Sequence, residues 1–301
     1  MRWCGGIQDT KYSIQNTYMT NDRHLFGILF LILVFDIWLY TTMFSFYFSQ
    51  DLKVYFLSVG QGDSTLLVMP SGKRFIIDGG PSAKLVSEIS GVLPPWVRRI
   101  DGILATHPQK DHFAGFINLL DSYRVDYMFG NGDREDTETW QIFEKKLQEN
   151  NLIPIVLRTG DRIEGGGVHM NVLSPHDDVE VAHAKDKNDP GVVMRVEYQG
   201  KSFLFTADVP KEVLTRLPQE KLAVDVLKVP HHGSKTGLDE ELISKIHPII
   251  SVIEVGKNNY GHPKKEIVNL LFAHTQQLLR TDKERPKITV TNKGVLDIDM
   301  F

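Results

Sequence analysis

Four short apolar segments in this chain each end in side chains of the kind that bind metal ions, and this repeated pattern most constrains the fold. The side chains at these four ends are Asp78; His107 with Asp111 and His112; Asp208; and His231 with His232. Short apolar runs bounded by Gly or Pro are typical of buried strands. Because loops that follow buried strands can direct side chains to one place, the pattern predicts a site where imidazoles and carboxylates converge around a cation.

The two segments that contain histidine carry the stronger signal. His107, Asp111 and His112 follow one apolar strand closely, and this spacing lets neighbouring side chains serve two adjacent ions. A solvated polar loop is the alternative interpretation of this cluster. His231 and His232 follow a second apolar strand, and the glycine after them allows a close approach of other groups.

The two aspartate-ending segments are weaker signals when each is taken alone. Asp78 stands before a pair of glycines, where an aspartate often caps a turn. Asp208 could bridge two cations, but it could equally cap the helix that is predicted to begin near Pro210.

Metal binding in this chain must depend on histidines and carboxylates. The single cysteine, Cys4, excludes an intrachain disulfide and a zinc site built from several thiolates, whereas eleven histidines are available. The net charge of −4 excludes binding of nucleic acid by bulk positive charge, although it leaves room for a local basic groove. A hydrophobic content of 42% is enough for an ordinary core.

An apolar segment near the N-terminus, Leu25–Phe48, predicts a transmembrane anchor. It has 24 positions and one charge, Asp36, and about 20 apolar residues span a bilayer. A lone Asp within the membrane costs about 3 kcal/mol and could mark pairing with another membrane protein. A buried core helix and a cleavable signal peptide are the alternatives, but the segment has no polar face and no A-x-A site follows it.

The charges around this segment predict how the chain is oriented. Arg2, Lys11 and Arg23 precede it, and only Lys53 follows closely. The positive-inside rule therefore places the tail, residues 1–24, in the cytoplasm and the rest of the chain outside. We expect a single-pass membrane protein with an extracytoplasmic catalytic domain.

We expect residues 52–301 to form one α/β domain. Short strand patterns come early, and helix and strand patterns then alternate. One helix is predicted from Lys264 to about Leu279, and a closing hairpin over residues 288–298. Many strands with interleaved helices favour a layered fold with large mixed or antiparallel sheets.

Two longer strings are highly specific, namely the VGQGDS string at residues 59–64 and the VDVLKVPHHGS string at residues 224–234. With the four strand ends and Tyr260-Gly261-His262-Pro263, they resemble the metallo-β-lactamase fold superfamily, and within it the C-terminal hydrolase-like domain of ComEC-type competence (DNA-uptake) proteins. The resemblance covers about residues 52–301. It implies a four-layered αββα sandwich with one or two divalent metal ions, Zn²⁺ or Mn²⁺, at one sheet edge.

The resemblance also implies a role for each site residue. The implied metal ligands are His107 for the first ion, Asp111 and His112 for the second, Asp208 as a bridge, and either His231 or His232 to complete the second site. Asp78 would orient ligands from behind, together with Gln61 and Asp63 of the first string. His262 would contact the substrate or donate a proton, and Asp111 would orient the attacking water or accept its proton.

Two positions depart from the superfamily pattern. Gln109 stands where a His, or an Asp in the ComEC-like branch, is expected, and Asn188 replaces the usual third His of the first site. Their neutral carbonyl oxygens are weaker ligands than imidazole or carboxylate. The first site is therefore expected to be weak, vacant or suited to a hard ion such as Mn²⁺.

We expect a membrane-anchored, metal-dependent hydrolase that acts on an anionic substrate, with phosphodiesters and DNA as the first candidates. Four lysines near the motifs, Lys228, Lys235, Lys257 and Lys264, could assist but are expected to be plain surface charge. The alternatives are a hydrolase of a lactone or phosphocholine ester and a degenerate, non-catalytic binding module. Any membrane channel is expected to be supplied by a separate chain.

Overall fold

The computed structural model describes residues 24–42, 50–177, 188 and 190–301. The chain divides into two units, Met1–Ser49 and Gln50–Phe301. Most of the predicted cytoplasmic tail, residues 1–23, and the end of the predicted membrane span, residues 43–48, lie outside the described residues.

The first unit contains a helix, His24–Thr42, that is long and apolar enough to cross a membrane. It has 19 residues and a mean hydropathy of 2.1. Its length matches the roughly 20 residues that a bilayer requires. By length and composition it is therefore a candidate membrane span.

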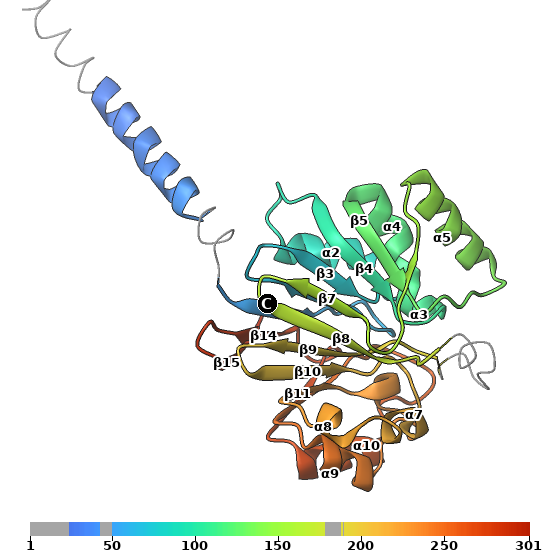
Figure 1. Ribbon diagram of the computed structural model, residues 1–301. Coiled ribbons are helices and arrows are strands. Elements are labelled where there is room, and N and C mark those ends of the chain that lie inside the picture. Colours follow the sequence, from blue (N-terminus) through green and yellow to red (C-terminus); the bar gives the residue numbers. More distant parts are fainter. Residues whose placement is uncertain (1–23, 43–49, 178–187, 189) are drawn as a thin grey trace, which may run out of the picture. The chain divides into compact units, whose positions relative to one another are not determined.

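The second unit is built on two β-sheets that face each other (Figure 1). The eight-stranded sheet has the order β15-β14-β1-β2-β3-β4-β5-β6, in which the strands from β3 to β6 are parallel and the others antiparallel. Its strands are β1 (Leu52–Phe56), β2 (Thr65–Val68), β3 (Arg74–Ile77), β4 (Arg99–Ala105), β5 (Arg124–Gly130), β6 (Ile155–Val156), β14 (Pro286–Val290) and β15 (Leu296–Met300).

The seven-stranded sheet has the order β13-β12-β11-β10-β9-β8-β7. Strands β10 to β13 run parallel, and β7 to β10 pair antiparallel. Its strands are β7 (Arg162–Gly165), β8 (Val168–Ser174), β9 (Val193–Tyr198), β10 (Lys201–Phe205), β11 (Val226–Lys228), β12 (Ile250–Ile253) and β13 (Gln277–Arg280).

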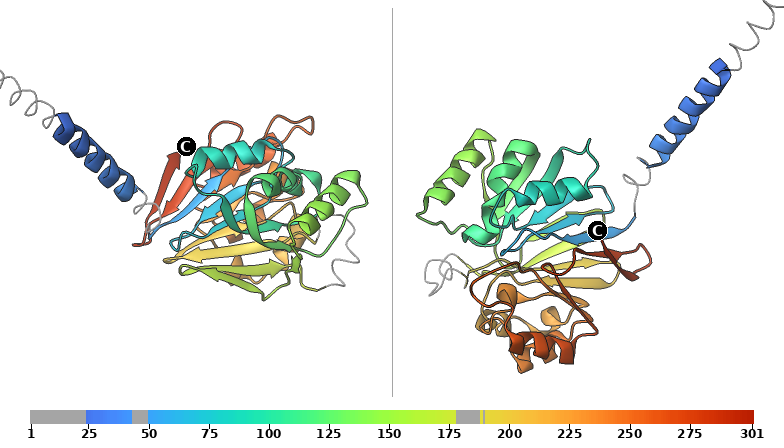
Figure 2. Two further views of the ribbon diagram at one scale, coloured as in Figure 1. Left: turned by 90° about the horizontal axis from the view of Figure 1, so that it is seen from above. Right: turned by 180° about the vertical axis from the view of Figure 1, so that it is seen from behind.

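Helices cover the outer face of each sheet, which gives the predicted αββα sandwich (Figures 1 and 2). The first sheet carries α2 (Lys84–Val92), α3 (Lys110–Phe113), α4 (Gly115–Ser122) and α5 (Glu138–Glu149). The second carries α7 (Lys211–Thr215), α8 (Gln219–Leu222), α9 (Glu240–Ile246) and α10 (Lys265–His274). The expected fold class is confirmed.

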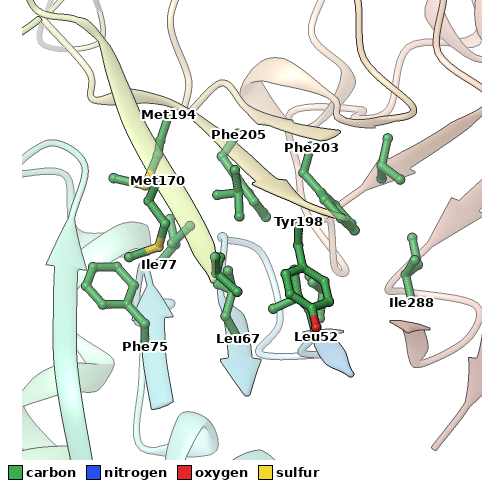
Figure 3. Packing of buried hydrophobic residues seen from close by; sticks show 14 of the residues in the cluster. Leu52, Leu67, Phe75, Ile77, Met170, Met194, Tyr198, Phe203, Phe205 and Ile288 are labelled. Carbon is green, nitrogen blue, oxygen red and sulfur yellow. The ribbon is translucent and has the colours of Figure 1, made fainter. Parts of the chain in front are cut away.

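Strand alternation builds two core layers from one sequence. Phe203 and Phe205 of β10 point into the layer between the sheets, where they meet side chains of the first sheet such as Leu52 (Figure 3). Leu204, between them, packs on the other face against helix residues such as Leu242. Because successive side chains on a strand point to opposite faces, a continuous apolar run marks a strand buried on both faces.

One predicted helix is shorter than expected. The interval from Lys264 to Leu279 contains α10, which ends at His274, and then β13, which pairs parallel with β12. The apolar residues Leu278 and Leu279 fit the helical period of the preceding residues. They are instead fixed by their place beside β12, a tertiary contact that periodicity does not contain.

Candidate metal centre

Four side chains from three segments converge at one edge of the sandwich. The carboxyl end of β4 in one sheet, and those of β10 and β11 in the other, lead into these segments. Asp111, His112, Asp208 and His232 each offer one ligand atom, and these atoms all lie within 4.8 Å of one another. The sequence left open whether His231 or His232 is the ligand. In the structure His232 belongs to this group and His231 does not.

Short distances at the centre of this group join ring nitrogens to carboxylate oxygens. His232 Nε2 lies 3.2 Å from Asp208 Oδ2 and 3.3 Å from Asp111 Oδ2. His112 Nε2 lies 3.3 Å from the same Asp208 oxygen. Two imidazole nitrogens and two carboxylate oxygens are a donor set that borderline divalent cations accept.

Hydrogen bonds behind the rings hold the histidines as ligands. His232 Nδ1 donates to the carbonyl oxygen of Glu254 over 2.9 Å, and its Nε2 faces the group, within hydrogen-bond distance of Asp111 Oδ2. His112 Nδ1 lies 2.8 Å from Asp78 Oδ2, and its buried Nε2 has no hydrogen-bond partner. A ring fixed through one nitrogen, with the other turned towards carboxylates, is the arrangement of a metal ligand, so these residues fit a cation.

Asp78 takes the supporting position expected of it. Its carboxylate accepts from the backbone N–H of Thr106 over 2.8 Å and from the Thr106 hydroxyl over 2.9 Å, besides contacting His112. Burial raises the pKa of Asp78, and the neighbouring His112 opposes that rise. Asp78 therefore anchors both the end of β4 and the His112 ring.

The backbone around the site takes conformations that non-glycine residues seldom adopt. Asp78, Ala207, His231 and His232 have φ values between 49° and 59°. Gly233 follows with φ 79°, and a Cβ there would lie 2.7 Å from Cβ of Pro263. Such strain is characteristic of functional sites, and the turn at residues 231–233 brings His232 to the group.

His107 lies beside the group but outside it. Its ring centroid is 4.1 Å from that of His112, and its buried Nε2 has no hydrogen-bond partner. Burial, assisted by the nearby His112, lowers the pKa of His107 to about 3. A neutral imidazole with an unused nitrogen can serve as a ligand.

A cavity of about 670 Å³ opens over the centre. Asp111 and Asp208 lie in its wall with Gln109 and Asn188, the two neutral residues expected from the sequence at the first metal site. Asp111 is the ligand side chain most accessible to solvent, at 32% exposed. Although burial raises the pKa of Asp111, the hydrogen bond from His232 and the charge of His112 hold it at about 2.

His231 and His262 face each other at the mouth of this cavity, with ring centroids 5.7 Å apart. Burial lowers the pKa of His231, and burial with the nearby His231 lowers that of His262 to about 4. His262 is therefore neutral near pH 7. That charge state favours contact with substrate over donation of a proton.

The VGQGDS string supplies two further residues at this edge. Gln61 lines the cavity, and its side-chain oxygen accepts from the backbone N–H of Gly256 over 3.3 Å. Asp63 is buried, and its Oδ1 lies 3.1 Å from His232 Nδ1. Asp63 also forms a second group with Asp78 and His112, in which ligand atoms lie within 4.8 Å of one another.

Two residues near the site were not predicted correctly from the sequence. Lys228, expected on the surface, is only 3% exposed and forms an ion pair with Asp63. Glu254 is buried at the end of β12, and burial together with Asp63 raises its pKa to about 8. Glu254 follows an apolar strand directly, much as Asp78 and Asp208 do. This pattern could have identified Glu254 from the sequence.

The sequence matches a known family of domains over residues 73–233, the β-lactamase superfamily domain. ComE operon protein 3 of Bacillus subtilis (strain 168) is 31% identical over 258 residues, which cover 78% of this chain and 32% of that protein. Competence protein ComA of Neisseria gonorrhoeae is 27% identical over 236 residues, covering 74% and 30%. The chain spans about a third of the length of these curated relatives.

Solved structures show the same fold. The metallo-β-lactamase fold protein YhfI from Bacillus subtilis superposes with a TM-score of 0.50 at 12% sequence identity, covering 76% of this chain and 95% of that one. At this identity the likeness concerns the fold alone.

Proposed function

The chain belongs to the β-lactamase superfamily, and we propose that it is a membrane-anchored, metal-dependent hydrolase of phosphodiester bonds. The observation that supports this most is the group of four ligand side chains, which meets a cavity at one sheet edge. The apolar helix His24–Thr42 is the proposed anchor.

Asp111, His112, Asp208 and His232 would hold one divalent cation at the second site, and His107 with Gln109 and Asn188 would offer a weaker set of ligands at the first site. When bound, such a cation would supply Lewis acidity, which lowers the pKa of water towards about 7. We propose Zn²⁺ or Mn²⁺, because imidazole suits the first and carboxylate or carbonyl oxygen the second.

Asp111 is the residue that we propose to orient the attacking water and accept its proton. Its carboxylate is ionised near pH 7 and is the ligand side chain most accessible from the cavity. A general base must lie within hydrogen-bond reach of the proton it takes, and a water in this cavity could meet that requirement.

The residues around the cavity suit an anionic substrate. Lys110 and Lys257 line it with their positive charges, and Tyr260 and His262 supply rings at the same wall. Neutral His262 would contact the substrate, while the lysines would attract a phosphate diester. Nucleic acid is therefore the first substrate to test, and a channel protein on a separate chain remains a proposed partner.

The test is hydrolysis of bis(p-nitrophenyl) phosphate and of single-stranded DNA by the full chain in detergent, with Mn²⁺, Zn²⁺ or EDTA. We expect turnover with one of the metals, none in EDTA, and a loss of at least about 100-fold in kcat for Asp111→Ala. The control His169→Ala, on β8 outside the cavity lining, should match the wild type. Hydrolysis of a lactone alone would contradict the phosphodiester assignment, and hydrolysis of a phosphocholine ester without DNA would contradict nucleic acid as the substrate.

A second candidate function is a binding module without catalysis. Gln109 and Asn188 line the cavity, and neither brings a charge to the first metal site. Metal binding without turnover on any ester of a substrate panel would favour this candidate.

A further inference from the structure

Lys228 is a lysine at a position where an apolar residue would be expected. Val226, two residues earlier on β11, belongs to the core between the sheets, whereas Leu227 packs against the outer helices. Strand alternation therefore directs Lys228 into the layer between the sheets. An ammonium group buried there is unfavourable unless charged partners compensate for its lost hydration.

The partners of Lys228 all belong to the metal centre or its support. The ammonium forms an ion pair with Asp63 and donates to the carbonyl oxygen of Ala207 over 2.9 Å. It also lies 3.5 Å from Asp208 Oδ1. The lysine of one sheet thus contacts a loop of the other sheet and a carboxylate of the ligand group.

The two oxygens of Asp208 face different groups. Oδ2 lies 3.3 Å from His112 Nε2 and 3.2 Å from His232 Nε2, inside the ligand group. Oδ1 is on the Lys228 side. The two oxygens of Asp63, on the other side of the His232 ring, are divided in the same way. One pairs with Lys228, and the other lies 3.1 Å from His232 Nδ1.

We propose that Lys228 is a built-in counter-ion of the metal centre, which keeps the buried carboxylates of Asp63 and Asp208 in place before a cation binds. This inference rests on the metal centre of the proposed function. Because the ammonium and the metal both attract Asp208, each reduces the stabilisation that the other provides. The metal-free protein therefore depends on Lys228 more than the metal-loaded protein does.

The experiment measures thermal unfolding of the full chain in detergent, in EDTA and in excess MnCl₂ or ZnCl₂. Loss of one partner from a buried pair is strongly destabilising, so Lys228→Met should lower the Tm in EDTA by about 10 °C. With metal the loss should be about half of that. The metal-induced rise in Tm is then larger in Lys228→Met than in the wild type.

Two further variants keep the inference testable if Lys228→Met fails to fold. In Lys228→Met/Asp63→Asn the buried charge pair is removed as a unit, so we expect the Tm in EDTA to recover by at least about half. Its metal-induced rise should still exceed that of the wild type. Lys235→Met is the matched control, because Lys235 is 59% exposed and pairs with Glu266, and it should change neither Tm.

The outcomes separate this inference from the proposed function. An enlarged metal-induced rise supports it. A rise equal to that of the wild type would mean that Lys228 only fills space. A smaller rise would mean that Lys228 positions ligands for the metal. Either result overturns this inference and leaves the proposed function standing. If the wild-type Tm does not respond to metal, the proposed centre fails and this inference fails with it.

Discussion

At the residue scale, the chemistry depends on which nitrogen of each histidine reaches the centre. His112 and His232 both use Nδ1 for support, at Asp78 and at the Glu254 carbonyl, and present Nε2 to Asp208. The adjacent His231 points instead towards His262. The two neighbours of one histidine pair are therefore predicted to differ in metal binding.

His232→Ala should lose most of the bound metal, whereas His231→Ala should keep it. Removal of a ligand leaves three donors of the group, while removal of His231 leaves all four. Metal content of both variants by plasma mass spectrometry after dialysis measures the difference. Equal loss in the two variants would contradict the assignment of His232.

Gln109→Asp should increase the metal content of the protein. A carboxylate in place of the amide adds a charged ligand to the first metal site, in the wall of the same cavity as Asp208. Isothermal titration with Mn²⁺ should then show a second binding event or a tighter one. A titration curve that matches the wild type would show that this position does not limit binding at the first metal site.

The sequence named the four side chains that the structure brings together, because each follows a recognisable apolar strand. It could not predict the environment of Lys228. Its neighbours Val226 and Leu227 showed a buried strand, but the facing Asp63 comes from the other sheet. Only the packing of one sheet on the other brings these side chains together, and local sequence patterns do not contain that information.

At the element scale, the position of α3 and α4 sets the ligands Asp111 and His112. Gly115 begins α4 and lies against the backbone at the end of β3, where its N–H donates to the Gly80 carbonyl oxygen over 2.9 Å. A Cβ at Gly115 would lie 2.0 Å from the carbonyl oxygen of Gly79. The helix can approach the strand end only because this residue has no side chain.

Gly115→Ala should therefore destabilise the protein by about 2 kcal/mol or more. The matched control is Gly91→Ala in α2, where the nearest atom to a new Cβ is an Arg285 side-chain nitrogen at 3.6 Å. This control should be neutral or stabilising by up to about 1 kcal/mol, because alanine favours helix. Denaturant unfolding in EDTA measures both, and equal effects would contradict the packing argument.

Helix and strand types were predicted best where one pattern covered a whole element. Strands such as β10 and β11, which are largely apolar and are followed by side chains of metal-binding type, were identified directly, whereas β13 was absorbed into the preceding helix. The four residues of β13 depend on pairing with β12. Short edge strands of this kind take their conformation from a neighbour, so no local signal separates them from a helix end.

At the scale of the whole molecule, two sheets from distant parts of the chain must pack before the centre exists. Asp111 and His112 follow a strand of the first sheet, and Asp208 and His232 follow strands of the second. A cation bound by all four would join the sheets in the folded state only. Metal should therefore stabilise the fold as a ligand does.

Addition of Mn²⁺ or Zn²⁺ at about 100 times its dissociation constant should stabilise the wild type by about 2.7 kcal/mol. For a domain of this size that raises the Tm by roughly 5–10 °C. Thermal unfolding with and without EDTA is the measurement. The Asp208→Asn variant should lose most of the rise, and a full rise in that variant would contradict its place in the centre.

The most direct test of the centre is anomalous X-ray diffraction from crystals of the protein grown with Mn²⁺ or Zn²⁺. We predict an anomalous peak within bonding distance of Asp111, His112, Asp208 and His232 together. A peak at other residues, or none from fully loaded protein, would contradict the account.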